Sequence, residues 1–172
     1  MGTSAPAAQP VLTMNAGWSC TAIASPVGSL VLRASNEGLV SISRGRAKRV
    51  QGDSKAERHV ALAARELGEY FAGKRRTFTV PLDLQGTPFQ VKAWKTLLRI
   101  PFGKVVSYGE EARMLGKPTA YRAVGSANGR NPIPIIVPCH RVVAGDGTLG
   151  GYSAGLPMKR KLLALEGVSV AG

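Results

Sequence analysis

Acidic residues are scarce in this sequence. Its 172 residues include 10 Asp and Glu against 23 Lys and Arg, which gives a formal net charge of +13. Solubility alone does not require so large an excess of one sign. The excess predicts an anionic partner, with nucleic acid the first candidate and an anionic membrane surface the second.

Cysteine is also scarce, and only Cys20 and Cys139 are present. They can form at most one disulfide, and no Cys or His cluster has the spacing of zinc ligands, so we expect no metal site and a reducing compartment. No apolar run is long enough to span a bilayer, and the Ala-, Pro- and Ser-rich start lacks a signal-peptide pattern. These absences predict a cytoplasmic globular protein without a membrane segment.

The first half of the sequence predicts a small sheet with one helix. Short runs rich in β-forming residues are separated by turn residues, which favours an antiparallel meander over residues 18–23, 29–34 and 39–43. From Ser54 the pattern becomes helical and it stops at Gly73. The apolar face of this helix is expected to carry Val60, Ala64, Leu67 and Phe71.

The second half predicts mainly helices. Thr87 can cap a helix that Pro88 opens. Two further short helices, over residues 107–115 and 118–128, are joined by a turn that contains Gly116, which is the outline of a helix-turn-helix. Such outlines are common and are weak evidence for a DNA-binding motif by themselves. The sequence therefore predicts an α+β protein with a disordered tail (1–15), an N-terminal α/β domain (16–84) and a C-terminal helix-turn-helix domain (85–172).

A proline-rich segment, residues 131–143, contains Cys139 followed at once by His140. Its three prolines restrict φ and bias the preceding residues toward extended backbone, so we expect a stiff, non-helical strap. An inert buried cysteine beside a surface histidine is the ordinary interpretation of a lone Cys-His pair. A rigid support and a neighbouring base favour a nucleophile instead. The Gly- and Ser-rich loop at residues 150–155 follows closely enough to line the same cavity.

The predicted helix over residues 118–128 is rich in small residues, among them Ala123 and Gly125, and carries one long cation, Arg122. Small side chains let a backbone approach another polymer, and a projecting Arg can enter a groove or a gap in a base stack. An ordinary packed helix with a surface Arg is the alternative. Because the helix runs directly into the segment that holds Cys139, we predict chemistry on DNA.

The run Pro138-Cys139-His140-Arg141-Val142 is the most specific pattern in the chain. Runs before it and after it belong to the same pattern: Ser25-Pro26-Val27-Gly28, Tyr70-Phe71-Ala72-Gly73, Phe89-Gln90, Ile100-Pro101-Phe102-Gly103, Ser107-Tyr108-Gly109, Arg122-Ala123-Val124-Gly125, Asn131-Pro132, Gly151-Tyr152 and Leu165-Glu166-Gly167. Together, over about residues 18–168, they resemble the O6-alkylguanine-DNA alkyltransferases.

The resemblance implies a ribonuclease H-like N-terminal domain and a winged-helix-like C-terminal domain that approaches DNA from the minor groove. It implies stoichiometric, irreversible transfer of an alkyl group from O6-alkylguanine in double-stranded DNA to the protein, after the nucleotide has been flipped out of the duplex, with no cofactor. We expect a monomer. Repair of O4-alkylthymine and cooperative binding to DNA stay open. The zinc site of some relatives lacks matching ligands here.

The resemblance also implies catalytic roles. Cys139 is expected to accept the alkyl group, with His140 as general base through a water and Glu166 orienting the histidine. Tyr108 is expected to push on the 3′ phosphate of the flipped nucleotide and to supply a proton to the leaving guanine. Asn131 is expected to be the hinge between the recognition helix and the cysteine.

Contacts with DNA and with the base follow from the same resemblance. Arg122 is expected to occupy the space that the flipped nucleotide leaves. The helix backbone near Ala123 and Gly125 is expected to approach the DNA. The base pocket is expected to include Val137, Pro134, Tyr152 and Ser153.

Two positions depart from the family pattern. Tyr121 replaces a small residue on the helix face that approaches the sugar-phosphate chain. Glu111 replaces an apolar residue that packs the first helix of the motif, so either the helix is shifted or the carboxylate is exposed or paired.

Two other functions fit parts of the sequence. A related group of proteins binds alkylated bases without an acceptor thiol and recruits other repair, and the presence of Cys139 argues against this reading. A cysteine hydrolase could use Cys139, His140 and Glu166, although such enzymes usually have the histidine far from the cysteine in sequence.

Overall fold

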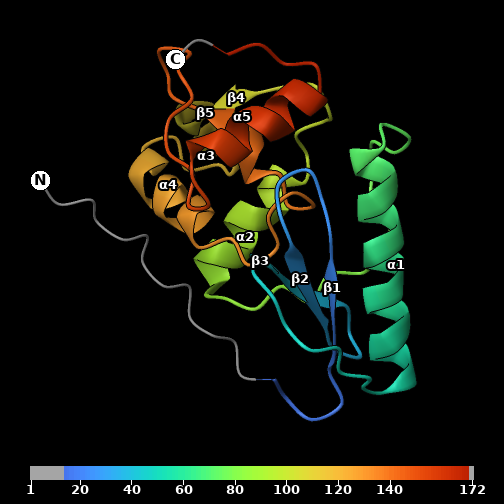
Figure 1. Ribbon diagram of the computed structural model, residues 1–172. Coiled ribbons are helices and arrows are strands. Elements are labelled where there is room, and N and C mark those ends of the chain that lie inside the picture. Colours follow the sequence, from blue (N-terminus) through green and yellow to red (C-terminus); the bar gives the residue numbers. More distant parts are fainter. Residues whose placement is uncertain (1–13, 171–172) are drawn as a thin grey trace, which may run out of the picture.

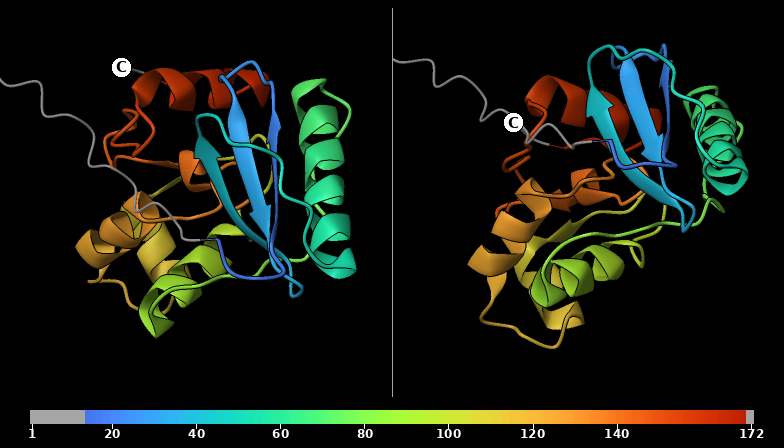
Figure 2. Two further views of the ribbon diagram at one scale, coloured as in Figure 1. Left: turned by 60° about the horizontal axis from the view of Figure 1, so that its bottom comes forward. Right: turned by 90° about the horizontal axis from the view of Figure 1, so that it is seen from below.

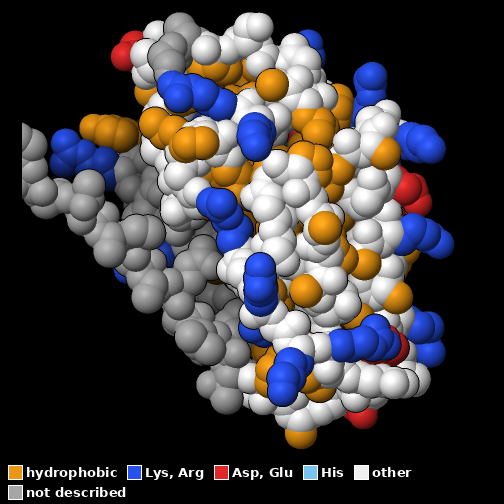
Figure 3. All heavy atoms as spheres, viewed as in Figure 1, with side chains coloured by type: hydrophobic (Ala, Val, Ile, Leu, Met, Phe, Trp, Pro, Cys, Tyr) orange, Lys and Arg blue, Asp and Glu red, His pale blue; other side chains and the backbone are white. Residues whose placement is uncertain are grey.

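The computed structural model describes residues 14–170, so nearly all of the tail predicted over residues 1–15 lies outside the described residues. A sheet with one long helix forms one side of the molecule, and shorter helices form the other (Figure 1). This arrangement confirms the predicted α+β class. No helix among residues 14–170 is long and apolar enough to cross a membrane. On the face shown in Figure 3, Lys and Arg side chains are widely spread and Asp and Glu are few.

The sheet is an antiparallel meander in the order β1-β2-β3, as predicted. β1 (Ser19–Ile23), β2 (Leu30–Ala34) and β3 (Leu39–Arg44) pair along their length. In the first turn the Gly28 N–H donates to the Ser25 carbonyl, and Gly28 has a φ of 105°, a region that glycine enters without steric cost. The turn residues between the strands therefore produce the meander.

α1 (Ser54–Phe71) lies along one face of the sheet (Figure 2). Two of the predicted core positions, Ala64 and Phe71, are only partly buried, so the apolar face is rotated from the predicted one. The helix ends just before Gly73, which has a φ of 75° and confirms the predicted stop. The apolar residues that α1 buries are Ala56, Val60, Ala63, Leu67 and Tyr70.

The connection after α1 holds no strand. Within this connection, residues 77–84 form only an isolated bridge, between Leu82 and Leu39. Its backbone is held by a side chain instead, because the buried Glu66 accepts hydrogen bonds from the N–H groups of Thr79 and Val80. Those N–H groups are therefore satisfied without pairing to another strand.

α2 (Pro88–Leu97) begins as predicted. The Thr87 hydroxyl accepts from the Gln90 N–H, and the Gln90 side chain accepts from the Thr87 N–H, which completes a capping box. The helix ends at Leu97. A tight turn, in which the Ile100 N–H donates to the Leu97 carbonyl, carries the chain onward.

α3 (Tyr108–Met114) and α4 (Tyr121–Gly129) pack against each other and form the predicted helix-turn-helix. A second capping box, between Ser107 and Glu110, begins α3. The prediction that α4 begins at Pro118 was wrong, because a hydrogen-bonded turn precedes the helix.

The proline-rich segment 131–143 is not an unbroken extended strap, so that prediction was only partly correct. The chain turns at Ile135, whose φ of 77° lies in the left-handed region, and a bridge between Pro134 and Val137 closes the turn. A β-branched residue in this region costs about 1–3 kcal/mol, so surrounding contacts must hold the turn. The segment then forms a 3-10 turn over Cys139–Arg141 and the strand β5 (Val142–Val143), which pairs in parallel with β4 (Val106–Ser107).

The two halves share one apolar core. α5 (Leu156–Leu165) carries Pro157 in its first turn and buries Met158 and Leu162 in this core. The Ile42 N–H of β3 donates to the Pro132 carbonyl at 2.9 Å, so the sheet supports the segment that leads to Cys139. The sheet therefore helps to position the residues described next.

Candidate active site

Cys139 lies in the wall of a hollow of about 150 Å³. Its side chain is nearly covered, at 6% exposure, and it begins the 3-10 turn, so the segment before it sets its position. α3, α4 and the predicted Gly- and Ser-rich loop all contribute to the same wall. The other lining residues are Tyr108, Gly125, Asn128, Gly129, Gly151, Tyr152 and Ser153.

His140 and Glu166 are in direct contact, although 26 residues separate them in the sequence. His140 is completely buried, and its Nε2 lies 2.6 Å from Glu166 Oε2 at the end of α5. Glu166 also accepts from the Tyr70 hydroxyl at 2.6 Å and from Arg141 Nε at 2.8 Å. A second Arg141 nitrogen donates to the Ile100 carbonyl at 2.7 Å. Glu166 therefore joins α1, α5 and the cysteine segment.

The hydrogen bonds around Glu166 determine which nitrogen of His140 is free. Burial alone would raise the pKa of Glu166, but hydrogen bonds from His140, Arg141 and Tyr70 outweigh burial and hold this pKa at about 2. The carboxylate is then ionised and can only accept, so Nε2 of His140 carries the proton. Burial lowers the pKa of His140, which keeps the ring neutral. Nδ1 is therefore an acceptor, and it has no hydrogen-bond partner among the described residues.

The thiol of Cys139 is protonated at neutral pH in this structure. Burial raises its pKa to about 11, although a hydrogen bond from Asn131 and the positive charge of Lys159 act in the opposite direction. Because the thiolate is the nucleophilic form, a base must remove this proton. His140 follows Cys139 directly in the sequence, and its Nδ1 is an acceptor without a hydrogen-bond partner among the described residues.

Asn131 ties the turn before Cys139 together. Its Nδ2 donates to the Val137 carbonyl at 2.8 Å, and its Oδ1 accepts from the Ile133 N–H at 2.9 Å. The side chain is buried, so the two hydrogen bonds that support the strained turn at Ile135 are shielded from water. The role of Asn131 as a hinge stays a prediction.

Sequence reasoning missed Lys159. This residue lies on the buried face of α5, and its Nζ donates to the carbonyls of Val142, Leu149 and Gly151. Burial lowers the pKa of Lys159 to about 8, so the ammonium form still predominates at pH 7. Its helical spacing from the apolar Leu162 places it on the buried face, and that spacing was the available signal.

Tyr70 and Arg141 were likewise given no role. Tyr70 lies 96 residues from Glu166 in the sequence, and no local pattern relates the two. Arg141 is part of the specific Pro138–Val142 run, which was a signal that this cation has a fixed partner.

The outer surface of α4 carries the predicted DNA-contacting residues. Arg122 and Ala123 are exposed, and Gly125 lies against Tyr108. The Arg122 guanidinium lies 5.9 Å from the ring centre of Tyr121, which is 49% exposed. Tyr121 therefore places a large ring beside Arg122 on this surface.

The predicted base-pocket residues divide into two groups. Tyr152 and Ser153 line the hollow. Val137 is fully buried behind it and Pro134 is partly buried, and neither belongs to the lining residues. The Tyr152 hydroxyl is buried and has no hydrogen-bond partner among residues 14–170.

Glu111 is buried and paired. Asn128 Nδ2 donates to its Oε2 at 2.7 Å, which settles the choice that the sequence left open between an exposed and a paired carboxyl.

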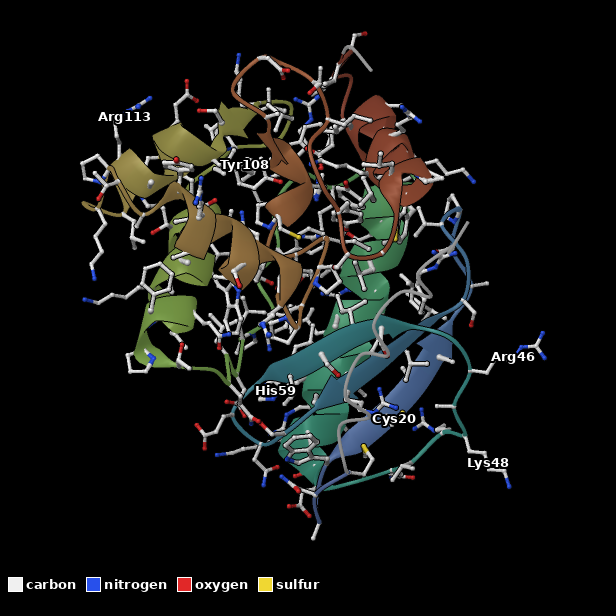
Figure 4. All side chains as sticks on the ribbon, turned by 90° about the vertical axis from the view of Figure 1, so that its left-hand side faces the viewer. Cys20, Arg46, Lys48, His59, Tyr108 and Arg113 are labelled. Atoms are coloured by element: carbon white, nitrogen blue, oxygen red, sulfur yellow. The ribbon has the colours of Figure 1, made fainter. Side chains whose placement is uncertain are left out.

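Cys20 lies on β1, at the opposite side of the molecule from Tyr108 (Figure 4). Both cysteines are free. Among residues 14–170, no group of His, Cys, Asp and Glu side chains could hold a metal ion.

Two family models match the chain. The model described as "6-O-methylguanine DNA methyltransferase, ribonuclease-like domain" matches residues 19–84. The model described as "6-O-methylguanine DNA methyltransferase, DNA binding domain" matches residues 88–168. Together they cover most of the sequence.

Individual proteins are similar over nearly the whole chain. A methylated-DNA--protein-cysteine methyltransferase of Methanosarcina acetivorans is 47% identical over 147 residues, which are 83% of this chain and 94% of that protein. The crystal structure of the Mycobacterium tuberculosis O6-methylguanine methyltransferase is 44% identical, with a TM-score of 0.75 over 87% of this chain and 92% of that one. A structure of the Mycobacterium tuberculosis protein in complex with DNA is 45% identical, with a TM-score of 0.75 over 84% of this chain and 90% of that one.

The fold and the matched domains define a DNA-binding methyltransferase of DNA repair. More particularly, the chain belongs to the 6-O-methylguanine DNA methyltransferase family.

Proposed function

We propose that this protein repairs O6-alkylguanine in double-stranded DNA by moving the alkyl group irreversibly to Cys139, after the nucleotide has been flipped out through the minor groove. The observation that carries the proposal is the position of Cys139. It lies in a hollow beside the helix-turn-helix, and the ionised Glu166 behind it leaves one nitrogen of His140 free to take a proton. Family membership supports the same chemistry.

The first step is removal of the thiol proton. A water passes this proton from Cys139 to His140 Nδ1, and the resulting imidazolium is stabilised by the adjacent Glu166 carboxylate. Arg141 and Tyr70 hold that carboxylate in place, so they act as positioning residues.

The second step is displacement at the alkyl carbon. The bond from Cys139 Sγ to carbon forms while the bond from carbon to guanine O6 breaks, and the electron pair passes to the guanine. A proton from Tyr108 neutralises the leaving base. Burial raises the pKa of Tyr108, so its hydroxyl is protonated before the reaction and can donate this proton to the leaving guanine.

Binding to DNA uses the outer surface of α4. The small residues Ala123 and Gly125 let the backbone approach the duplex, and the exposed Arg122 fills the gap in the base stack. Holding a base outside the stack costs a few kcal/mol, which Arg122 offsets in part. Tyr108 presses on the 3′ phosphate, and Asn131 joins α4 to the cysteine segment.

The product is a thioether, and it ends the reaction. Water can hydrolyse an acyl-cysteine because the carbonyl carbon stays electrophilic, whereas an S-alkyl cysteine offers water no such carbon and no good leaving group. Each protein molecule is therefore used once. The protein acts as a monomer in the cytoplasm, with domains over residues 16–84 and 85–172.

Intact-protein mass spectrometry tests this function directly. The protein is incubated with a duplex that contains a single O6-methylguanine and is then digested for peptide mapping. The proposal predicts one added methyl group on the peptide that contains Cys139, and restored guanine in the DNA. An unchanged protein mass with bound, unrepaired DNA would show a binding protein. Repeated loss of methyl groups without a covalent product would show a hydrolase.

A duplex with O4-methylthymine, run in parallel, shows whether the same hollow accepts a pyrimidine.

A further inference from the structure

Glu111 and Asn128 form a buried pair beside the hollow. Glu111 on α3 is completely buried, and Asn128 on α4 is 7% exposed and lines the hollow together with Cys139. Asn128 Nδ2 donates to Glu111 Oε2 at 2.7 Å. The pair therefore joins the two helices of the helix-turn-helix at the wall of the candidate active site.

One oxygen of each side chain has no hydrogen-bond partner among the described residues. These atoms are Glu111 Oε1 and Asn128 Oδ1, and both are buried. When the carboxyl is ionised, both atoms can only accept, so they cannot pair with each other. Native proteins rarely leave two buried polar atoms unpaired, and each such atom requires an explanation.

Within residues 14–170, no cation compensates a negative charge on Glu111. Among residues 14–170, Glu111 takes part in no ion pair. Arg113 on the same helix projects into solvent (Figure 4), and Glu110 is also exposed. β4 and β5 carry no charged residue. The cations on the helices packed against α3 are exposed as well: Lys92, Lys95 and Arg122.

A negative charge on Glu111 acts on two neighbouring titratable groups, Tyr108 and Cys139, and raises the pKa of each. Burial raises the pKa of both, so both are neutral near pH 7. An ionised Glu111 would therefore be a buried charge without a countercharge, which proteins usually avoid by protonation.

We propose that Glu111 is protonated in the folded protein and forms a cyclic acid–amide pair with Asn128, which positions Asn128 in the wall of the hollow. A protonated carboxyl donates as well as accepts. Its O–H at Oε1 pairs with Asn128 Oδ1, while Oε2 keeps the hydrogen bond from the amide. A single proton thus satisfies both unpaired atoms. In agreement, burial raises the pKa of Glu111 to about 7.

The pair makes the site sensitive to pH. When Glu111 loses its proton, two oxygens face each other without a hydrogen between them, and the contact between α3 and α4 weakens. The negative charge of Glu111 is also one of the causes that raise the pKa of Cys139. Both effects oppose alkyl transfer. This last consequence rests on the proposed function, whereas the pair itself does not.

The variant that tests the pair is Glu111→Gln, because an amide can donate to Asn128 Oδ1 and accept from Nδ2 without any proton. The matched control is Glu110→Gln, which removes the same charge from the exposed neighbouring residue. Gln also serves in a capping box, so the control keeps the cap at Ser107.

Infrared spectroscopy detects the proton itself. At pH 6, surface carboxylates are ionised and absorb separately from a protonated carboxyl. We expect a protonated-carboxyl band in the wild type and in Glu110→Gln, and loss of this band in Glu111→Gln. A wild-type spectrum without the band, or a band that persists in Glu111→Gln, would overturn the proposal.

Unfolding in denaturant gives a second readout. The folded-state pKa of Glu111 lies above its unfolded value of 4.5, so the stability it contributes is complete below pH 4.5 and is lost as the pH rises through about 7. We expect the ratio of the folding equilibrium constant of Glu111→Gln to that of the wild type to rise by up to about 300-fold across this window. Parallel pH profiles for the two proteins would contradict the pair.

The pH profile of a single methyl transfer tests the coupling to the site. The rate of Glu111→Gln relative to the wild type should rise about tenfold between about pH 6 and about pH 8.5, while the relative rate of Glu110→Gln stays constant. A constant ratio for Glu111→Gln would overturn the positioning role. If the wild type transfers no methyl group at any pH, the proposed function fails. The infrared and unfolding results then still show whether the acid–amide pair of Glu111 and Asn128 forms.

Discussion

Cys20 and Cys139 are chemically identical side chains, both buried and both free, yet they lie in very different surroundings. Burial raises the pKa of each thiol. Neither cysteine is therefore a ready thiolate, and an unusually acidic thiol does not distinguish the candidate nucleophile. What distinguishes Cys139 is the hollow that it lines and the histidine next to it in the sequence, whose Nδ1 has no hydrogen-bond partner among the described residues.

The same contrast holds for the regions around the two cysteines. The sheet around Cys20 is held by regular strand pairing, whereas the segment around Cys139 is held by side chains that satisfy an irregular backbone. Asn131 and Lys159 between them bond four carbonyls and one N–H. A reactive residue in a short turn thus requires polar supports that a strand residue does not.

The largest expected effect comes from exchanging the two thiols for hydroxyls. Cys139→Ser should abolish methyl transfer, because a neutral hydroxyl is a much poorer nucleophile than a thiolate, and binding to DNA should persist. Cys20→Ser should transfer at the wild-type rate. Single-turnover assays with a methylated duplex, beside binding to an unmodified duplex, measure both. If Cys139→Ser still transferred methyl groups and Cys20→Ser did not, the assignment of the nucleophile would be reversed.

Glu166→Gln tests the support behind the nucleophile. The substitution leaves the buried Arg141 without its carboxylate, and breaking a buried pair in this way costs about 3–5 kcal/mol. It also removes the constraint that places the proton on His140 Nε2, and general-base catalysis is typically worth about 10²–10⁴ in rate. Urea unfolding at pH 7 and single-turnover rates measure the two losses.

The pH dependence of stability sharpens this prediction. Glu166 has a folded-state pKa of about 2, below its usual 4.5, so its contribution is complete above pH 4.5 and is lost as the pH falls through about 2. The wild type should lose about 3 kcal/mol across this window through Glu166, and Glu166→Gln should not. The exposed Glu37→Gln serves as the control and should follow the wild type. Equal acid sensitivity of all three proteins would contradict the role of Glu166.

Arg122→Ala separates base flipping from attraction to phosphate. Log affinity for unmodified duplex should fall linearly with log salt, by about 0.9 for each phosphate neutralised. Loss of Arg122 should change that slope by at most about 0.9, the contribution of one phosphate contact. It should slow repair of duplex DNA more strongly, because the gap left by the flipped base stays empty. An Arg122→Ala protein that repairs duplex at the wild-type rate would exclude the proposed role.

The smallest expected effect is a loss of stability after alkylation. The added methyl group is attached to the side chain of Cys139, which is nearly covered, and inserting a methyl group into the packed surroundings of a covered side chain typically costs about 1–3 kcal/mol. Methylated protein should therefore melt at a lower temperature than unmodified protein. The same treatment of Cys139→Ser is the control, and its melting temperature should not change.

Much of this fold was predictable because its signals are local. The capping boxes at Thr87 and Ser107 lie within four-residue windows, and the turns of the meander contain the glycines that such turns require. The face of α1 was misjudged because several positions of that helix are apolar or small, and only packing decides which of them face the sheet.

The candidate site was less predictable than the fold. Cys139 and His140 are adjacent, and Glu166 could be assigned only through resemblance to a family. Tyr70 reaches Glu166 across 96 residues of sequence, a contact that only the tertiary fold creates. The left-handed Ile135 was equally hidden, because its prolines favour extended backbone and the turn is imposed by Asn131.

The central claim is that Cys139 is an acceptor used once, and a titration tests it most directly. A fixed amount of protein is mixed with increasing excess of duplex carrying O6-methylguanine, and repaired guanine is counted together with the mass of the protein. The account predicts that repair stops at about one lesion per protein molecule, with every molecule one methyl group heavier at Cys139. Sustained repair beyond one equivalent, or repair without a methylated protein, would contradict it.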